Sequence, residues 1–158
     1  MKNHEFPFQQ GDLDWLCSLY ATINLMHLQK DIDGIEDAGI KFNELLQYVA
    51  TNGDLFRTIT EGVYRADVIE FLSHFDYKAK RFVKPTPEEI VEHSTDGAII
   101  YLKRPDGFDH YTAIRTVGGL GKIELFDSYG FKKIQCRDGA WFLDDGEIEI
   151  LNLYTAKK

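Results

Sequence analysis

A change of hydrophobic periodicity at Gly97 limits the fold of this chain more than any other feature of its sequence. Before Gly97, apolar residues recur at the three- and four-residue spacing of helices. After it, they form short runs bounded by Gly and Asp, which is typical of strands joined by tight turns. Helices that come first and consecutive strands that follow favour an antiparallel sheet with the helices on one side. We therefore predict an α+β fold.

Four segments before Gly97 are predicted helices, and they cover residues 15–28, 41–51, 68–75 and 86–93. The first is apolar almost all the way round, so we expect it to lie buried at the centre of the molecule. Asp14 is a suitable N-cap for this helix, which would place Cys17 at its third position. The last helix has a capping box, because Thr86 is a cap residue and Glu89 follows it at the third helical position.

Five segments after Gly97 are predicted strands, and they cover residues 98–102, 111–117, 122–127, 131–136 and 147–154. The second and third are expected to form a hairpin, with Val117 opposite Lys122 and Thr112 opposite Asp127. Because side chains alternate across a strand, a slip by one residue would move Asp127 to the other face of the sheet.

The length of 158 residues suffices for one compact domain and is too short for two ordinary ones, so we predict a single domain over residues 1–158. The formal net charge of -8 repels phosphate backbones and anionic membranes, so neither nucleic acid nor a membrane is an expected partner. The basic side chains of residues 78–84 are expected on the solvated edge of a strand or loop. No segment has the pattern of a signal peptide or a membrane-spanning helix, so we expect a cytoplasmic protein, with specialised secretion as an alternative route.

The two cysteines, Cys17 and Cys136, are too few for a disulfide framework or a metal site, so each is interpreted as a free thiol in a reducing compartment. Cys17 differs because it lies in the first turn of a predicted helix. Unpaired backbone N–H groups and the positive end of the helix dipole favour a thiolate there. The alternative interpretation of Cys17 is a small apolar core residue.

His110 is the histidine that starts a predicted strand, after the turn formed by residues 105–107. In the predicted hairpin, Asp127 lies diagonally from His110 at roughly 7 Å between the backbones, and a carboxylate can reach the imidazole from there. Asp127 also suits the first position of a β-turn, and both descriptions can hold together. Gln10 precedes Cys17 by seven residues and is a candidate donor to an oxyanion, with Gln9 as its competitor.

The order of these residues resembles that of the papain-like cysteine peptidases. The resemblance rests on residues 10–21, 109–114 and 126–128. In that superfamily a glutamine precedes the nucleophilic cysteine, which opens the central helix, and a histidine and an Asn or Asp follow on strands. The short chain is most similar to small bacterial members, including the peptidase domains that trim bacteriocin leaders. Two features depart from the pattern: the glutamine is commonly six residues before the cysteine, and Ser18 stands where relatives commonly have Gly or Trp.

The resemblance implies a papain-like fold, with a central N-terminal helix that carries Cys17 and packs on an antiparallel sheet. It implies a thiol protease in which Cys17 attacks an amide carbon, His110 protonates the leaving amine, Asp127 orients His110 and Gln10 binds the oxyanion. No metal or organic cofactor is needed, and the expected substrate is a protein or peptide. The same triad would also serve an effector-type glutamine deamidase, a transglutaminase or a peptidoglycan amidase. An alternative of another class is a catalytically silent acidic binding or immunity-type module.

Overall fold

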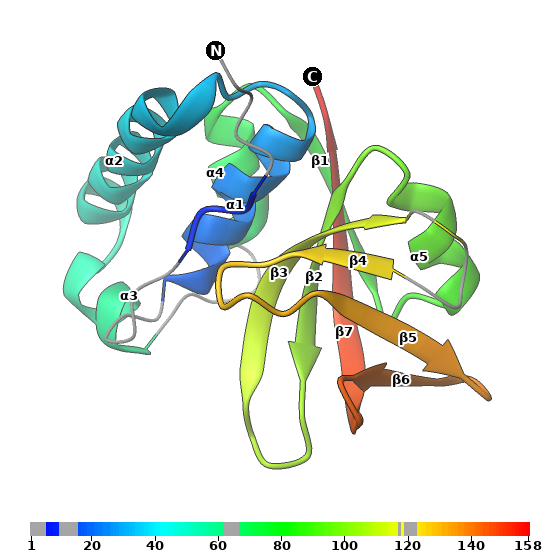
Figure 1. The fold of residues 1–158 in the computed structure, drawn as a ribbon. Helices are drawn as coiled ribbons and strands as arrows, with labels where there is room; N and C mark the ends of the chain where they lie inside the picture. The colour runs from blue at the N-terminus through cyan, green and yellow to red at the C-terminus, as the bar shows by residue number, and fades with distance from the viewer. Residues whose placement is uncertain (1–5, 10–15, 62–66, 117, 119–122) are drawn as a thin grey trace.

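The structure is a computed structural model that describes residues 6–9, 16–61, 67–116, 118 and 123–158. Five helices and seven strands lie within these ranges (Figure 1). The helices are α1 (Cys17–Leu28), α2 (Gly34–Asn52), α3 (Leu55–Glu61), α4 (Asp67–His74) and α5 (Pro87–His93). The strands are β1 (Lys78–Val83), β2 (Ala98–Lys103), β3 (Asp109–Thr116), β4 (Ile123–Phe126), β5 (Lys133–Arg137), β6 (Ala140–Leu143) and β7 (Gly146–Lys157).

The strands form one antiparallel sheet in the order β1-β7-β2-β3-β4-β5-β6, and β6 also pairs with β7. The additional pairing closes six of the strands, β2 to β7, into a barrel, while β1 lies outside the closed ring. The predicted papain-like α+β fold, with the helix that carries Cys17 packed on an antiparallel sheet, is therefore wrong, because the sheet closes into a barrel. The prediction lacked β6, and β6 is the strand that brings the two ends of the sheet together.

The length and bend of β7 explain how the barrel closes. The first part of β7 pairs with β6, and its last six residues pair with β1. On the other side β7 pairs with β2, and a β-bulge shifts the register between Tyr101 and Leu102. A bulge bends a strand and increases its twist. One strand can therefore contribute both to the closed barrel and to the extension that carries β1.

Two hydrophobic cores lie on the two sides of the barrel wall. The first lies between the helices and the outer face of the sheet, and α1 is at its centre with Leu19, Ile23 and Leu25 buried. The second fills the barrel interior and includes Ile100, Ile114 and other aliphatic side chains of the strands. In Figure 1, α1 to α4 lie on one side of the barrel and α5 lies on the other.

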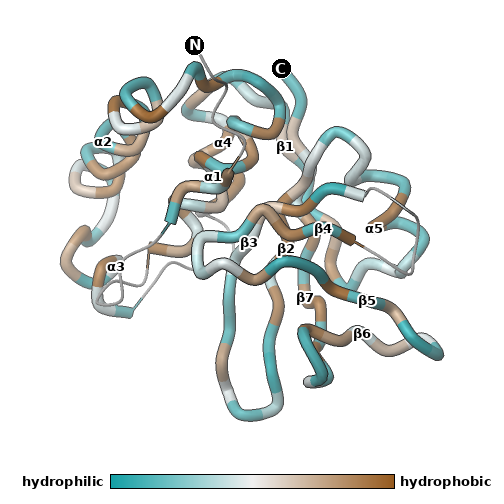
Figure 2. Tube along the Cα trace, viewed as in Figure 1, coloured by the Kyte–Doolittle hydropathy of each residue, from teal (hydrophilic) through white to brown (hydrophobic). Residues whose placement is uncertain are grey.

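The expected central helix is present, and it packs mainly against β3. Eight of its twelve residues are buried, as the apolar run predicts. Figure 2 shows hydrophobic residues along α1 and several strands, whereas hydrophilic residues mark turns that project from the barrel. The basic residues of β1 are also as expected, because β1 is an edge strand and its Lys78, Lys80 and Arg81 side chains are exposed. The position of α1 against β3 determines where its first residue meets the barrel.

Candidate active site

Cys17 is the first residue of α1, and Leu16 occupies the N-cap position. The prediction had placed Cys17 at the third helical position behind an Asp14 cap, so the helix begins two residues later than predicted. Asp14 itself lies outside the described residues. The carbonyl of Leu16 accepts the N–H groups of Leu19 and Tyr20. The N–H groups of Cys17 and Ser18 have no acceptor four residues earlier within α1, so they contribute to the positive end of the helix dipole. The thiol of Cys17 is half-buried at this end of the helix.

The hairpin of β3 and β4 has the predicted register. Ala113 pairs with Phe126 and Thr116 pairs with Ile123. This register places Asp127, the residue after β4, on the same face as His110, and the two side chains are in direct contact. The distance from His110 Nε2 to Asp127 Oδ1 is 2.5 Å, and both side chains are fully buried.

Asp127 is fixed by its own turn as well as by His110. Its Oδ2 accepts the backbone N–H groups of Tyr129 at 2.9 Å and of Phe131 at 3.1 Å. The backbone carbonyl of Asp127 accepts the N–H of Gly130, which closes a β-turn. The two expected descriptions of Asp127, turn residue and partner of the imidazole, therefore hold together. A carboxylate held at both oxygens presents a fixed acceptor to His110.

The buried pair shifts the ionisation of both partners. Burial alone would raise the pKa of Asp127, but the hydrogen bond and charge of His110 outweigh it and hold the pKa of Asp127 below its usual value. Burial alone would lower the pKa of His110, but the hydrogen bond to Asp127 and the neighbouring Cys17 side chain raise it to about 9. At neutral pH the pair is therefore an imidazolium and a carboxylate.

The second ring nitrogen of His110 is the one left to interact with Cys17. Since Nε2 is bonded to Asp127, the interaction of His110 with Cys17 falls to Nδ1. Nδ1 is buried, and within the described part of the chain it has no hydrogen bond of normal geometry. The thiol therefore lies close enough to stabilise the imidazolium without a well-aligned hydrogen bond to it. Catalytic hydrogen bonds are often long or poorly aligned before a substrate binds.

Three aromatic rings surround the imidazole. The centroid of the His110 ring lies 4.8 Å from that of Tyr129, 5.8 Å from that of Phe108 and 6.1 Å from that of Phe131. Tyr129 is 40% exposed, whereas His110 is buried. Sequence analysis did not identify Phe108 and Phe131 as part of the site. Their positions two residues before His110 and four residues after Asp127 are the signal that would have found them.

Of the two candidate oxyanion donors, the structure describes Gln9 and not Gln10. Gln10 lies outside the described residues. Gln9 is described, and its side-chain Nε2 donates to the carbonyls of Pro7 at 3.3 Å and of Asp127 at 3.2 Å. An amide nitrogen has two hydrogens, so both are used in these bonds. The Gln9 amide is therefore a link between the N-terminal segment and the Asp127 turn, and Gln10 stays the predicted oxyanion donor.

Asn24 is a further polar residue that the sequence analysis did not identify. It is fully buried on α1, and its side chain bonds to the backbone of Phe8. The signal for it was an amide in the middle of an otherwise apolar helix, seven residues after Cys17. Two helical turns separate these residues, so they lie on the same face of α1.

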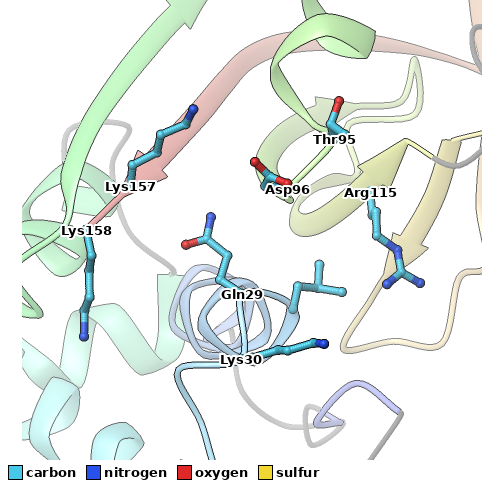
Figure 3. A pocket seen from close by; sticks show the side chains of 8 residues that line it. Gln29, Lys30, Thr95, Asp96, Arg115, Lys157 and Lys158 are labelled. Carbon is cyan, nitrogen blue, oxygen red and sulfur yellow. The ribbon is translucent and has the colours of Figure 1, made fainter.

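A second feature of the described structure is a hollow of about 470 Å³ at the other end of α1. Four cationic side chains line it together with Asp96 and Gln29 (Figure 3); they are Lys30, Arg115, Lys157 and Lys158. Two of these cations are already paired, because Arg115 bonds to Glu124 and Lys158 bonds to Asp31. Because the hollow adjoins Leu28 and not Cys17, it is no part of the candidate active site.

The described ranges contain no group of three or more His, Cys, Asp or Glu side chains arranged to hold a metal ion. None of the helices in these ranges combines the length and the apolar character that crossing a membrane requires. Comparison of the chain with protein-family models and with curated proteins gives no match.

Proposed function

We propose that this protein is a cysteine-dependent hydrolase that cleaves an amide bond in a protein or peptide substrate. The observation that carries the proposal is the buried contact of Asp127 with Nε2 of His110, which leaves Nδ1 for Cys17, the half-buried first residue of α1 whose side chain helps to raise the pKa of His110. A thiol, an imidazole and a carboxylate that act in this order form a nucleophile, a general base and an orienting group. The proposal rests on this arrangement and not on the class of the fold.

The proposed reaction has two steps. In the first, the sulfur of Cys17 attacks the carbonyl carbon of the amide, and the imidazolium of His110 gives a proton to the leaving nitrogen as the carbon–nitrogen bond breaks. In the second, His110 takes a proton from water, the resulting hydroxide attacks the thioester, and the carbon–sulfur bond breaks to release the acid and the thiolate. The backbone N–H of Cys17 and the amide of Gln10 are the proposed donors to the oxyanion.

Asp127 would serve both steps without changing its own protonation state. Its bond to Nε2 would keep a proton on that nitrogen, so the exchangeable proton would be on Nδ1, the nitrogen that we assign to the thiol. The burial of both side chains keeps water from competing for this bond. The two cysteines are free, which fits our proposal that the protein acts in a reducing compartment such as the bacterial cytoplasm.

Alkylation of the two cysteines tests the proposal without a known substrate. A thiol paired with an imidazolium reacts with iodoacetamide well below pH 8, whereas an ordinary thiol is about 0.3% ionised at pH 6. We expect Cys17 to be carboxamidomethylated at pH 6 at least ten times faster than Cys136, which is a matched control because it is also half-buried. Mass spectrometry of the modified peptides measures both rates in one sample. Equal, slow labelling would reject the thiol site and favour the silent binding module.

Turnover is tested with a peptide library and the Cys17→Ala variant. We expect the wild-type protein to release new peptide termini, and the variant to release none while it keeps the wild-type circular dichroism spectrum. Cys136→Ala is the control and should retain activity, since Cys136 is on β5, which β4 separates from the His110 strand β3. Cleavage that persists in Cys17→Ala would contradict the proposal.

A further inference from the structure

Asn24 holds a short N-terminal segment against the helix that carries the thiol. Its Oδ1 accepts the backbone N–H of Phe8 at 2.8 Å, and its Nδ2 donates to the backbone carbonyl of Phe8 at 3.2 Å. One buried side chain therefore satisfies both backbone polar groups of a residue that belongs to no helix or strand. We call residues 6–9 the N-terminal strap; in Figure 1 it runs along α1.

The other end of the strap is bonded to the turn that carries the acid of the triad. Gln9, the residue after Phe8, donates its amide to the backbone carbonyl of Asp127 at 3.2 Å. The side chains give a second link, because the His27 ring lies 5.2 Å from the ring of Phe8 and 5.6 Å from that of Phe126, which precedes Asp127. The strap thus joins α1 to the end of β4.

This connection matters because the thiol and the imidazole belong to different parts of the molecule. Cys17 is on α1 in the helical layer, and His110 and Asp127 are on the barrel. Since Nδ1 of His110 has no hydrogen bond of normal geometry in the described structure, the thiol and the ring are not locked together by a direct bond. Their separation depends on how α1 packs on β3 and on how α1 is held against the β4–β5 turn that carries Asp127. The strap contacts both α1 and this turn.

We propose that Asn24 is a positioning residue of the thiol site. It anchors the strap and so keeps the thiol of Cys17 close to the imidazole of the His110–Asp127 pair. This inference rests on the proposed function, because it concerns the pairing of the same thiol and imidazole. Asn24 touches neither reacting atom in this account. It acts through Phe8 and Gln9, and its removal should weaken the pairing without removing any member of the triad.

The test is the pH dependence of Cys17 alkylation by iodoacetamide in the Asn24→Leu variant. Leucine has a similar volume and cannot bond to Phe8. We expect the rate at pH 6 to fall at least tenfold, because loss of the imidazolium partner leaves a thiol that is little ionised at that pH. At pH 9 an ordinary thiol is mostly ionised without a partner, so the rate should change less than threefold. An unchanged pH profile in a folded Asn24→Leu variant would overturn the inference.

Two further variants separate positioning from a general effect on folding. Gln9→Met removes the hydrogen bond from the Gln9 side chain to the carbonyl of Asp127. Because Gln9 is exposed, the variant should fold, and its Cys17 alkylation rate should fall selectively at pH 6. Thr22→Val is the matched control, because Thr22 is also buried on α1 and, among the described residues, its hydroxyl bonds within the helix, to the carbonyl of Ser18. We expect Thr22→Val to keep the wild-type profile. A loss in Thr22→Val equal to that in Asn24→Leu would overturn the inference.

The same measurements distinguish this inference from the proposed function. If wild-type Cys17 is no faster than Cys136 at pH 6, the thiol site itself is rejected. If wild-type Cys17 is fast and both Asn24→Leu and Gln9→Met are equally fast, the proposed function stands and the positioning role of Asn24 is rejected. Fast wild-type labelling, with a selective loss of rate at pH 6 in Asn24→Leu and Gln9→Met, supports the proposed function and the positioning role of Asn24.

Discussion

The carboxylate of Asp127 makes more hydrogen bonds than an amide in its place could make. Oδ1 contacts His110, and Oδ2 accepts two backbone N–H groups from the following turn. An asparagine has one acceptor oxygen, so either His110 or the turn would face an NH₂ group and lose its acceptor. The chemistry of the triad and the stability of the turn therefore depend on the same side chain.

We predict that Asp127→Asn lowers the free energy of unfolding by about 2 kcal/mol, since two partly buried N–H groups or the buried imidazolium would be left without an acceptor. Urea denaturation measures this loss. Asp109→Asn is the control, because in the described part of the chain Asp109 accepts one hydroxyl, from Tyr101 at 2.7 Å, and an amide oxygen can still accept it. Equal losses in the two variants would contradict the role assigned to the Asp127 turn.

His110 makes the stability of the protein depend on pH. Its pKa in the folded protein is about 9, above the ordinary 6.5, so the folded state binds the proton more tightly than the unfolded state. The resulting stabilisation is fully present below pH 6.5 and is lost as the pH rises through 9. At about 1.4 kcal/mol for each pH unit, the free energy of unfolding should fall by about 3 kcal/mol over this range.

Urea denaturation at pH 6 and pH 9 checks this prediction, with His110→Gln as the reference. The glutamine variant has no group that titrates at this position, so the decrease should be absent from it. The direct measurement is an NMR titration of the imidazole. A titration of His110 near its ordinary value in the folded protein would remove the basis of the prediction.

Among the elements, α5 shows how a local sequence signal determines a helix start. Thr86 accepts the N–H of Glu89 through its side chain, and the carboxylate of Glu89 accepts the N–H of Thr86 at 2.8 Å. This capping box is the one that the sequence predicts. We expect Thr86→Ala to lower the free energy of unfolding by about 1 kcal/mol, as loss of an N-cap hydroxyl does elsewhere.

Thermal or urea unfolding measures the Thr86→Ala effect, and Thr60→Ala is the control. The Thr60 hydroxyl bonds to carbonyls within α3 and caps no helix start, so its loss should change stability less. A larger effect of Thr60→Ala would argue against the importance of the cap.

Elements whose signals are local were predicted, and elements that depend on distant contacts were not. The capping box of α5 and the register of the β3–β4 hairpin follow from residues close in sequence, and the His110–Asp127 contact follows from that register. In contrast, α2 begins at Gly34, about two turns before the predicted start, and α3 was missed. Both segments expose large apolar side chains, such as Ile35, Ile40 and Phe56, so the pattern of buried positions was weak there.

At the scale of the whole molecule, closure of the barrel could not be read from local patterns. Closure needs β6, a strand of four residues, and its pairing with the start of β7. The turn before β6 is formed by Asp138 and Gly139, and both have positive φ. Such a turn suits a two-residue hairpin, but it does not reveal that the next strand returns to the other end of the sheet. The relation of Asn24 to Asp127 is equally non-local, since it depends on the strap.

The contribution of the closed barrel to stability can be measured at Trp141, on the seam between β5 and β7. Trp141 pairs with Cys136 on one side and Ile148 on the other, and it is buried in the barrel interior. We predict that Trp141→Ala lowers the free energy of unfolding by about 3 kcal/mol or more, because it leaves a large cavity in this core. Phe142→Ala is the control on the same strand; Phe142 faces the other way, half-buried beneath the Arg137 guanidinium, and its loss should cost less. Amide hydrogen exchange should show faster opening of the β6–β7 pairing in Trp141→Ala than in Phe142→Ala. If the two variants are equally stable and exchange alike, the closing strand contributes little, and the molecule behaves as an open sheet with a loosely attached edge.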